Sequence, residues 1–244
     1  MKIFSLSLIY ILLASLNASS QVYNEYFDKR DFSVTTSVNY VTSASIQLNP
    51  NSTDIIEQNQ IEELHGGISY GLSIKKKMFG DDIMLGLSAE YLHIEDDNQK
   101  ERVFNGASTV NLRVTEIITV LPVELSVYYK LPKFTESFNL LLGGGMGVYF
   151  GTRERKILNL QTETNSTEQA LNFHIITAAE YIISRHLSAV ADITFREGEY
   201  RVDSSFPTNR VRVNGTTYMI QQNYDSKIFI DGLKLGLGLS YYFN

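Results

Sequence analysis

The chain has 244 residues, a hydrophobic fraction of 43% and a formal net charge of −6. This balance gives no indication of a nucleic-acid partner, and the length suits one domain or at most two. The sequence has no cysteine, which excludes a disulfide, a thiolate metal site and a lipoprotein anchor. Beyond the N-terminal stretch, no uninterrupted apolar run is long enough for a membrane-spanning helix.

The first residues have the organisation of a secretory signal peptide. A lysine precedes an apolar stretch that ends at Leu16, and the small residues Ala18 and Ser20 suit a cleavage site. We therefore interpret 1–20 as a cleaved signal peptide and 21–244 as one domain outside the cytoplasm. The alternative is an N-terminal membrane anchor, for which the stretch is short.

Apolar and polar residues alternate along most of the remaining chain, which predicts β-strands with one apolar face. The predicted strands cover residues 32–48, 64–78, 83–91, 109–131, 138–150, 171–183, 187–196 and 232–243. The longer segments 49–63, 95–108, 152–168 and 203–226 are predicted to be loops. Because long and short connections alternate, an antiparallel meander places the four long loops at one end and three short turns, with both termini, at the other.

The fourth predicted strand changes phase. Its apolar residues lie at even positions up to Val120 and at odd positions from Leu121 to Tyr129. One extra residue near Pro122 would restore a single apolar face, so we expect a β-bulge there. The first strand shows no such change, and Phe32 to Leu48 are expected to present one continuous apolar face.

Aromatic residues gather at two heights on the apolar faces, with aliphatic residues between them. The expected lower girdle is Phe32, Tyr129, Phe138, Tyr181, Tyr241 and Phe243, and the expected upper girdle is Tyr91, Phe150, Phe173, Phe195 and Phe229. Two aromatic girdles flanking an aliphatic band are typical of a transmembrane β-barrel. A soluble sandwich or a lipocalin-like barrel is the alternative reading of the alternation.

The opposite faces of the strands are polar and carry charges of both signs. A membrane barrel would enclose these residues, so they must pair with one another. The expected charge network in the lumen is Lys75, Glu90, Glu124, Lys130, Glu180, Asp192, Arg196 and Lys234.

Four stretches resemble the outer-membrane β-barrel domain family of Bacteroidetes-type bacteria, whose architecture is related to small OmpA/OmpX-type barrels. They are "VLPVELSVYYKL" (120–131), "SFNLLLGGGMGVYFG" (137–151), "AAEYIISRHLSAVADITF" (178–195) and the closing "LGLGLSYYF". The resemblance implies an all-β, eight-stranded antiparallel up-and-down barrel in the bacterial outer membrane. Gly238, Tyr241 and Phe243 match the spacing of the barrel-assembly signal, although Gly236 and Asn244 depart from it.

Several candidate sites have a plainer explanation. "GGGMG" (143–147) lies inside a strand, whereas a phosphate-binding loop lies between a strand and a helix. His186 and Ser188 have the spacing of the catalytic pair in outer-membrane lipid A deacylases, but a turn places them at the wrong end of the barrel. The four histidines show no metal-ligand spacing, and we expect no cofactor.

Cations in the predicted loops are the remaining candidates for binding. Arg153, Arg155, Lys156, Arg201, Arg210 and Arg212 are expected to contact lipopolysaccharide phosphates or to remain solvated. Asn214 and Gly215, with alternating residues on both sides, predict a β-hairpin that projects above the membrane and offers an edge to a partner strand.

The sequence therefore predicts a monomeric, non-enzymatic outer-membrane barrel with a lumen filled by side chains. Its loops would stabilise the envelope or mediate recognition and adhesion. Its expected partners are outer-membrane lipid, lipopolysaccharide, the barrel-assembly machinery and a surface protein. A narrow porin-like channel and a lipid A-modifying enzyme are the alternatives.

Overall fold

The computed structural model describes residues 30–79, 82–132, 135 and 137–243, and the predicted signal peptide lies outside these ranges. Within them, no helix has the length and hydropathy that crossing a membrane would require. The elements in chain order are β1 (Phe32–Gln47), α2 (Ile55–Gln58), β2 (Ile61–Phe79), β3 (Ile83–Phe104), β4 (Thr109–Lys130), β5 (Phe138–Ile157), β6 (Leu160–Gln161), β7 (Glu163–Gln169), β8 (Leu171–Ile182), β9 (Leu187–Glu197), β10 (Glu199–Ser205), β11 (Arg210–Val213), β12 (Thr216–Met219), β13 (Asn223–Phe229) and β14 (Gly232–Phe243).

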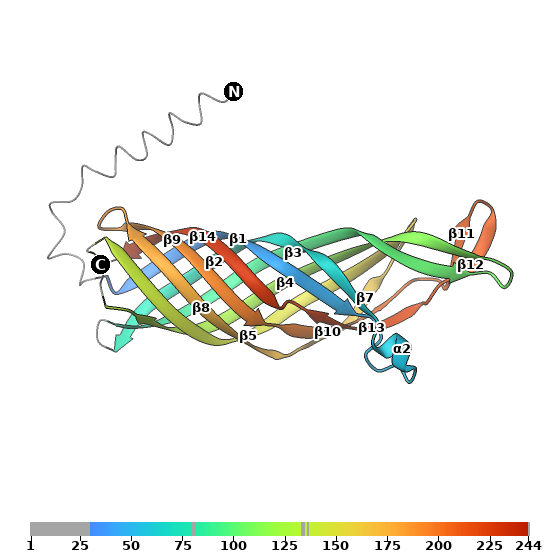
Figure 1. Cartoon of the computed structure of the whole chain (residues 1–244), viewed down its shortest axis with the longest axis horizontal. Helices are drawn as coiled ribbons and strands as arrows, with labels where there is room; N and C mark the ends of the chain where they lie inside the picture. Colours follow the sequence, from blue (N-terminus) through green and yellow to red (C-terminus); the bar gives the residue numbers. More distant parts are fainter. Residues whose placement is uncertain (1–29, 80–81, 133–134, 136, 244) are drawn as a thin grey trace, which may run out of the picture.

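Eight of these strands form a closed antiparallel ring, as the sequence predicted. Each of β1, β2, β3, β4, β5, β8, β9 and β14 pairs with the next in this order, and β14 closes the ring on β1. Phe32 pairs with Phe243, so the closure begins at the end where β1 starts and β14 finishes (Figure 1). Closure leaves this part of the sheet without a free edge.

The outer wall of the ring carries a broad band of exposed apolar side chains. Along β14, the outward residues run from Leu233 to Phe243, about 33 Å of strand at roughly 3.3 Å per residue, and Leu237 is 70% exposed. At the usual strand tilt this matches the apolar band of about 25 Å found in outer-membrane barrels. Tyr70 joins the expected upper girdle, since it pairs with Tyr91. Tyr40 lies on the neighbouring strand, where it pairs with Ile68.

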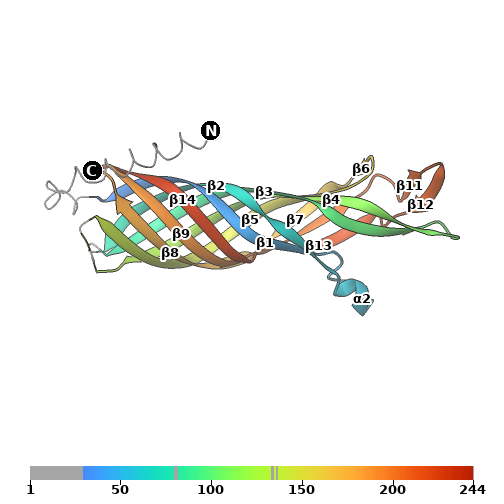
Figure 2. The same cartoon turned by 45° about the horizontal axis from the view of Figure 1, so that its top comes forward.

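The barrel wall continues as β-structure beyond the upper girdle, where the sequence analysis expected loops. This expectation was wrong for most of 95–108, 152–168 and 203–226. β10 continues the line of β9 and pairs with β13 and β7, while β11 and β12 form the predicted hairpin at the far end of the molecule (Figure 2). Segment 49–63 contains α2, which is capped by the Asp54 side chain.

The expected bulge near Pro122 is absent, because β4 keeps one register with β5 from Val114 to Lys130. The ladder between β3 and β4 is interrupted opposite Leu121 and Pro122 without a shift, as suits a residue with no N–H group. Described bulges lie elsewhere, for example in β3 between Asp96 and Gln99.

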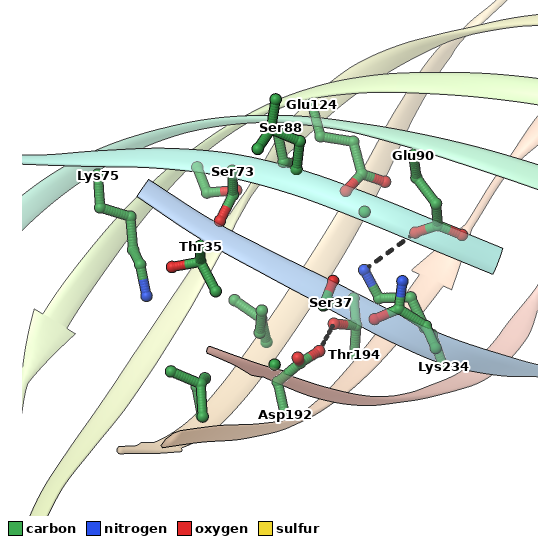
Figure 3. Close-up of a pocket in the computed structure, with 18 of the residues that line it drawn as sticks. Thr35, Ser37, Ser73, Lys75, Ser88, Glu90, Glu124, Asp192, Thr194 and Lys234 are labelled. Atoms are coloured by element: carbon green, nitrogen blue, oxygen red, sulfur yellow. Dashed lines mark hydrogen bonds and ion pairs between the residues drawn. The ribbon is translucent and has the colours of Figure 1, made fainter. Parts of the chain in front are cut away.

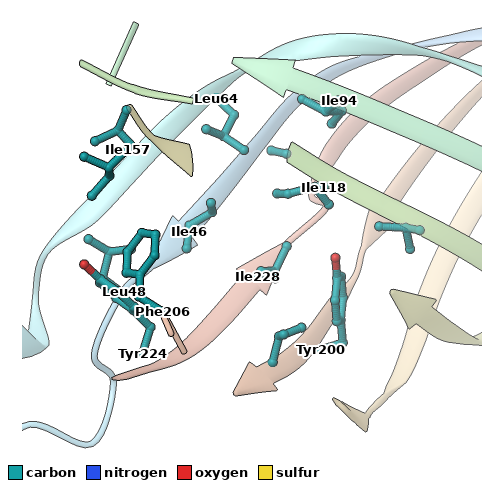
Figure 4. Close-up of a cluster of buried hydrophobic side chains, with 14 of the residues drawn as sticks. Ile46, Leu48, Leu64, Ile94, Ile118, Ile157, Tyr200, Phe206, Tyr224 and Ile228 are labelled. Atoms are coloured by element: carbon teal, nitrogen blue, oxygen red, sulfur yellow. The ribbon is translucent and has the colours of Figure 1, made fainter. Parts of the chain in front are cut away.

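The change of phase has a different cause, because the inward side chains differ between the membrane band and the region above it. Inside the membrane band, inward residues are polar or small and outward residues are apolar. Above the band, most inward residues are apolar and form a core that includes Ile118 and Ile228 (Figure 4). A regular strand such as β4 must therefore move its apolar residues from odd to even positions.

β1 shows the converse, and its expected continuous apolar face was wrong. Apart from Val41, its apolar residues keep even positions, yet Val38 and Tyr40 are exposed while Ala44 and Ile46 are buried. The faces exchange near Thr42, where the pairing of β1 with β14 and β13 shifts by one residue between Val41 and Ser45. Here a local irregularity, rather than a change in the sequence pattern, turns the apolar side inward.

Candidate functional site

The lumen inside the membrane band is the first candidate site, because it collects the predicted charges. Glu90 on β3 bridges two cations: Arg196 on β9 at 3.1 Å and Lys234 on β14 at 3.2 Å. Arg196 and Glu90 are both buried. Removing Glu90 would take the ion-pair partner from both cations inside the barrel, so this cluster holds three strands in a fixed arrangement.

A small polar cavity lies next to this cluster. Its volume is about 60 Å³, which is space for a few waters at roughly 10–15 Å³ each. Its wall includes the hydroxyls of Thr35, Ser37, Ser73, Ser88, Ser126 and Thr194 (Figure 3).

Lys75 and Asp192 line the same cavity but make no direct ion pair with each other in the part of the chain that is described. The Lys75 ammonium lies 5.5 Å from the centre of the Tyr128 ring, and Thr194 donates to Asp192 at 3.2 Å. Glu124 accepts a hydrogen bond of 2.9 Å from the Tyr149 hydroxyl. The predicted network is thus several small groups rather than one connected cluster.

The periplasmic end of the lumen is closed by a second group of polar side chains. Arg30 lies over the Tyr242 ring at 4.5 Å and donates to Ser188 at 3.1 Å. Tyr242 donates to Glu180, which also accepts from Asn139 at 3.0 Å. Lys130, the remaining member of the predicted network, is half-buried at the periplasmic end of β4.

Two tyrosine rings fill the lumen above the cavity, and each occupies space that a glycine leaves on the facing strand. A β-carbon at Gly198 would lie 2.2 Å from the Tyr149 ring, and one at Gly151 would lie 2.5 Å from the Tyr200 ring. Tyr149 and Tyr200 are each 1% exposed. These reciprocal contacts between β5 and the β9–β10 strand line hold both rings inside the lumen.

The sequence predicted that Arg153 and Arg155 lie on a loop facing lipopolysaccharide, and this prediction was wrong. Both point into the extracellular part of the barrel and are at most 1% exposed. Arg153 binds Glu116 through two hydrogen bonds of 3.0 Å. Arg155 binds Glu116 as well, together with Glu62 at 3.0 Å and Glu101 at 3.1 Å. A regular strand carries them inward because they continue the alternation of β5.

Electrostatics favour the charged form of Arg155. Burial opposes the charge on Arg155, but Glu116 and Glu62 raise the pKa of its guanidinium above the ordinary value. The Tyr224 ring lies 5.3 Å from both guanidinium carbons, and its hydroxyl donates to Glu101 at 3.1 Å. The cluster therefore cross-links β2, β3, β4, β5 and β13 above the membrane.

The other predicted lipopolysaccharide contacts remain on the outer surface. Lys156 is half-buried near the end of β5, and Arg201 is exposed on β10, where it pairs across the ladder with Lys227 and Glu168. Contact of these two residues with phosphate remains a prediction. Arg210 and Arg212 are exposed on β11, at the far end of the molecule from the membrane band (Figure 2).

The residues of the predicted assembly signal lie on the closing strand. Gly238 faces inward against Thr36 and Ser37 of β1, while Tyr241 and Phe243 are exposed on the lipid side. The Phe243 ring centre lies 5.6 Å from that of Phe32 and 4.9 Å from that of Tyr241. Their role in assembly remains a prediction.

His186 and Ser188 do not form a nucleophile–base pair. The His186 ring stacks on Tyr241 at 5.8 Å, whereas Ser188 is fully buried and bound by Arg30. In residues 30–79, 82–132, 135 and 137–243, no group of three or more acidic or histidine side chains is arranged to hold a metal. The glycines of 143–147 lie within β5, as expected.

The tyrosine and arginine side chains that fill the barrel above the membrane band were not predicted from the sequence. A signal was present: Tyr149, Arg153, Arg155 and Ile157 share the parity of the inward positions of β5. Glu116 likewise shares the parity of Val114 and Ile118 on β4. The polar composition of 152–168 concealed this continuation of the strand.

Comparisons with known proteins agree with this architecture. No protein-family model matches the chain, and no curated protein matches it in sequence. The outer membrane protein OprG from Pseudomonas aeruginosa is similar in structure, with a TM-score of 0.59 at 14% identity over 88% of this chain and 96% of OprG. The outer membrane protease OmpT from Escherichia coli gives a TM-score of 0.50 at 8% identity over 86% of this chain and 97% of OmpT.

These likenesses concern the fold, since the identities are low. Together with the closed ring and the exposed apolar band, they show that the chain has the fold of a small outer-membrane β-barrel. An apolar band around a closed ring of strands is the surface that a membrane barrel presents to lipid.

Proposed function

We propose that this protein is a sealed, non-enzymatic barrel whose extracellular β-extension serves recognition or adhesion at the cell surface. The observation that carries the proposal is the filling of the lumen. Arg30 and Tyr242 close its periplasmic end, and Tyr149, Tyr200 and the Arg153–Glu116 pair fill it above the cavity. Barrels of eight strands have interiors that side chains can fill completely.

The extension supports a role in recognition because it is ordered. Flexible loops lose conformational entropy when they bind, which reduces affinity. Here the apolar core around Ile118 and Ile228, and the salt bridges of Arg155, fix the extracellular strands before any partner arrives. A preorganised surface above the membrane is suited to repeated contact with one partner.

The proposal assigns no catalytic step to the protein. The two residues with the spacing of a hydrolase pair are separated by their orientation, since His186 faces Tyr241 outside and Ser188 binds Arg30 inside. The alternative of a narrow channel requires a continuous polar path, which the tyrosine rings above the cavity oppose.

Planar-bilayer recording tests the sealed lumen. The folded protein is inserted into bilayers, and insertion is verified by protection of the membrane strands from protease. We expect no steady unitary conductance. As a matched comparison, Tyr149→Gly combined with Tyr200→Gly removes only the two rings and should also remain non-conducting, because Arg30 with Tyr242 and the Arg153–Glu116 pair stay in place. Steady conductance of the unaltered barrel would overturn the proposal.

A further inference from the structure

The far end of the extension presents an outward face formed by four strands. Cross-strand pairs place Arg210 of β11, Met219 of β12, Phe104 of β3 and Thr109 of β4 in one row, because Arg210 pairs with Met219, Met219 with Phe104, and Phe104 with Thr109. Residues directly opposite in a ladder share a face. We call this surface the distal face.

The distal face is basic, although the chain as a whole has a net charge of −6. Arg212 lies beside the row on β11, and Arg102 and Lys100 lie on β3 below Phe104; all three side chains are exposed. Among the described residues, no carboxylate forms a salt bridge with Lys100, Arg102, Arg210 or Arg212. These cations are therefore available to a partner.

The centre of the same face is apolar. Phe104 is 53% exposed and Met219 is 61% exposed, and the two are directly opposite across the β12–β3 ladder. Their height excludes insertion in the bilayer of this barrel. Thr109, in the same row, lies about 40 Å along β4 from Leu121, or about 30 Å along the barrel axis, and Leu121 pairs with the girdle residue Phe150.

An aromatic and a methionine side chain bordered by arginines have the composition of a protein-binding surface. Phe, Met and Arg are enriched in protein interfaces, where a buried anchor lies inside a polar rim. The cations add a requirement for negative charge on the partner, since complementary charge increases the association rate and excludes wrong partners.

We propose that the distal face binds an acidic polypeptide segment that also carries an aromatic or large apolar side chain. The acidic groups would pair with Arg102, Arg210 and Arg212, and the apolar group would contact Phe104 and Met219. This inference rests on the proposed recognition function and assigns it a surface and a class of partner.

Two other anionic occupants fit the geometry less well. Phosphates of the barrel's own membrane lie several screening lengths below the face, because the Debye length is about 8 Å at physiological ionic strength. A second copy would offer Glu168, Asp203 and Asp225, which lie together on β7, β10 and β13. These acidic residues lie nearer the membrane than β11, so two barrels in one membrane would not align them with the distal face.

Binding of soluble polymers to the full barrel in nanodiscs tests the proposal. Fluorescent poly(Glu,Tyr), poly-Glu and dextran sulfate are compared at equal concentration of negative charge. We expect poly(Glu,Tyr) to bind at least about tenfold more tightly than poly-Glu. Replacing Arg102 and Arg210 by Ala should weaken the binding of both peptide polymers. Phe104→Ser with Met219→Ser should remove only the preference for the tyrosine-containing polymer.

The control variant is Lys156→Ala with Lys227→Ala, which changes the net charge equally outside the distal face and should leave binding unchanged. Equal binding of both peptide polymers, tighter binding of dextran sulfate, or equal loss in the control variant would each overturn the inference. Because bilayer conductance is measured separately, failure of this binding test is distinguishable from failure of the sealed-lumen proposal.

Discussion

Arg153 and Glu116 are joined by two hydrogen bonds of 3.0 Å inside the extracellular barrel, and neither side chain has exposed surface. A buried ion pair contributes little compared with apolar residues of the same shape, yet loss of one partner costs about 3–5 kcal/mol. Ile118, a member of the apolar core, pairs directly with Arg153 across the ladder, so the remaining charge would lie buried beside it. The pair therefore makes the extension sensitive to single substitutions.

Arg153→Met should lower the free energy of unfolding by about 3–5 kcal/mol, and Glu116→Leu should lower it further because Arg155 also loses a partner. The double variant should recover part of the loss, since no unpaired charge remains at the Arg153 position. Denaturant titration of the barrel in lipid vesicles measures all three. Glu154→Gln, on the outward face of β5, serves as the control; fully additive losses in the double variant would contradict this account.

Gly198 should tolerate no β-carbon while Tyr149 fills the lumen beside it. In Gly198→Ala the added carbon would lie 2.2 Å from the tyrosine ring, and overpacking of this kind costs about 1–3 kcal/mol. Displacement of the ring also weakens its hydrogen bond to Glu124. Tyr149→Leu should suppress the effect of Gly198→Ala in a double-mutant cycle of unfolding free energies, and an unchanged effect would refute steric contact as the cause.

The sequence predicted the ring of strands because alternation identifies a two-faced strand wherever one side is apolar. It could not show which side is the inside. In β1, Tyr40 and Ile46 share even positions although one faces lipid and the other faces the core. In β4, the apolar residues change from even to odd positions between Val120 and Leu121, although the strand keeps one regular register with β5. The assumption of a single apolar face therefore put the bulge in the wrong strand.

The candidate sites were predictable to the extent that they lie inside the membrane band. There, a charge on the polar face must point into the lumen, and Glu90, Arg196 and Lys234 meet as expected of enclosed charges. Above the band, polar composition no longer distinguishes an exposed loop from a strand with a buried salt bridge. Arg155 was assigned to the surface for this reason, because its three carboxylate partners lie far apart in the sequence.

Asp96 should make the bulge of β3 sensitive to acid. Burial opposes its ionisation, but the backbone N–H groups of His65 and Asn98, at 3.0 Å and 2.9 Å from its oxygens, lower the pKa of the carboxyl below its ordinary value. Because the folded pKa is lower, the stabilisation is complete above the unfolded pKa of about 4 and is lost as pH falls through the folded value.

Hydrogen-exchange protection factors of the His65 and Asn98 amides should therefore decrease as pH falls below about 4. Asp96→Asn should lower protection at neutral pH and remove its dependence on acid in this range. Amides of β14, remote from the carboxyl, provide the internal reference. Loss of protection in both regions together would indicate global unfolding and contradict the local assignment.

The closing strand allows its girdle role to be separated from its expected assembly role. Phe243 pairs with Phe32 at the seam, while Phe138 occupies the same girdle on β5 and pairs with Tyr181. Phe243→Ser and Phe138→Ser should each reduce the unfolding free energy of the refolded barrel similarly, because both remove an aromatic ring from the interface. Only Phe243→Ser should strongly reduce the amount of folded barrel in the outer membrane of expressing cells. Equal reduction by both variants would mean that Phe243 acts through stability alone, since an assembly signal depends on position in the last strand and a girdle residue does not.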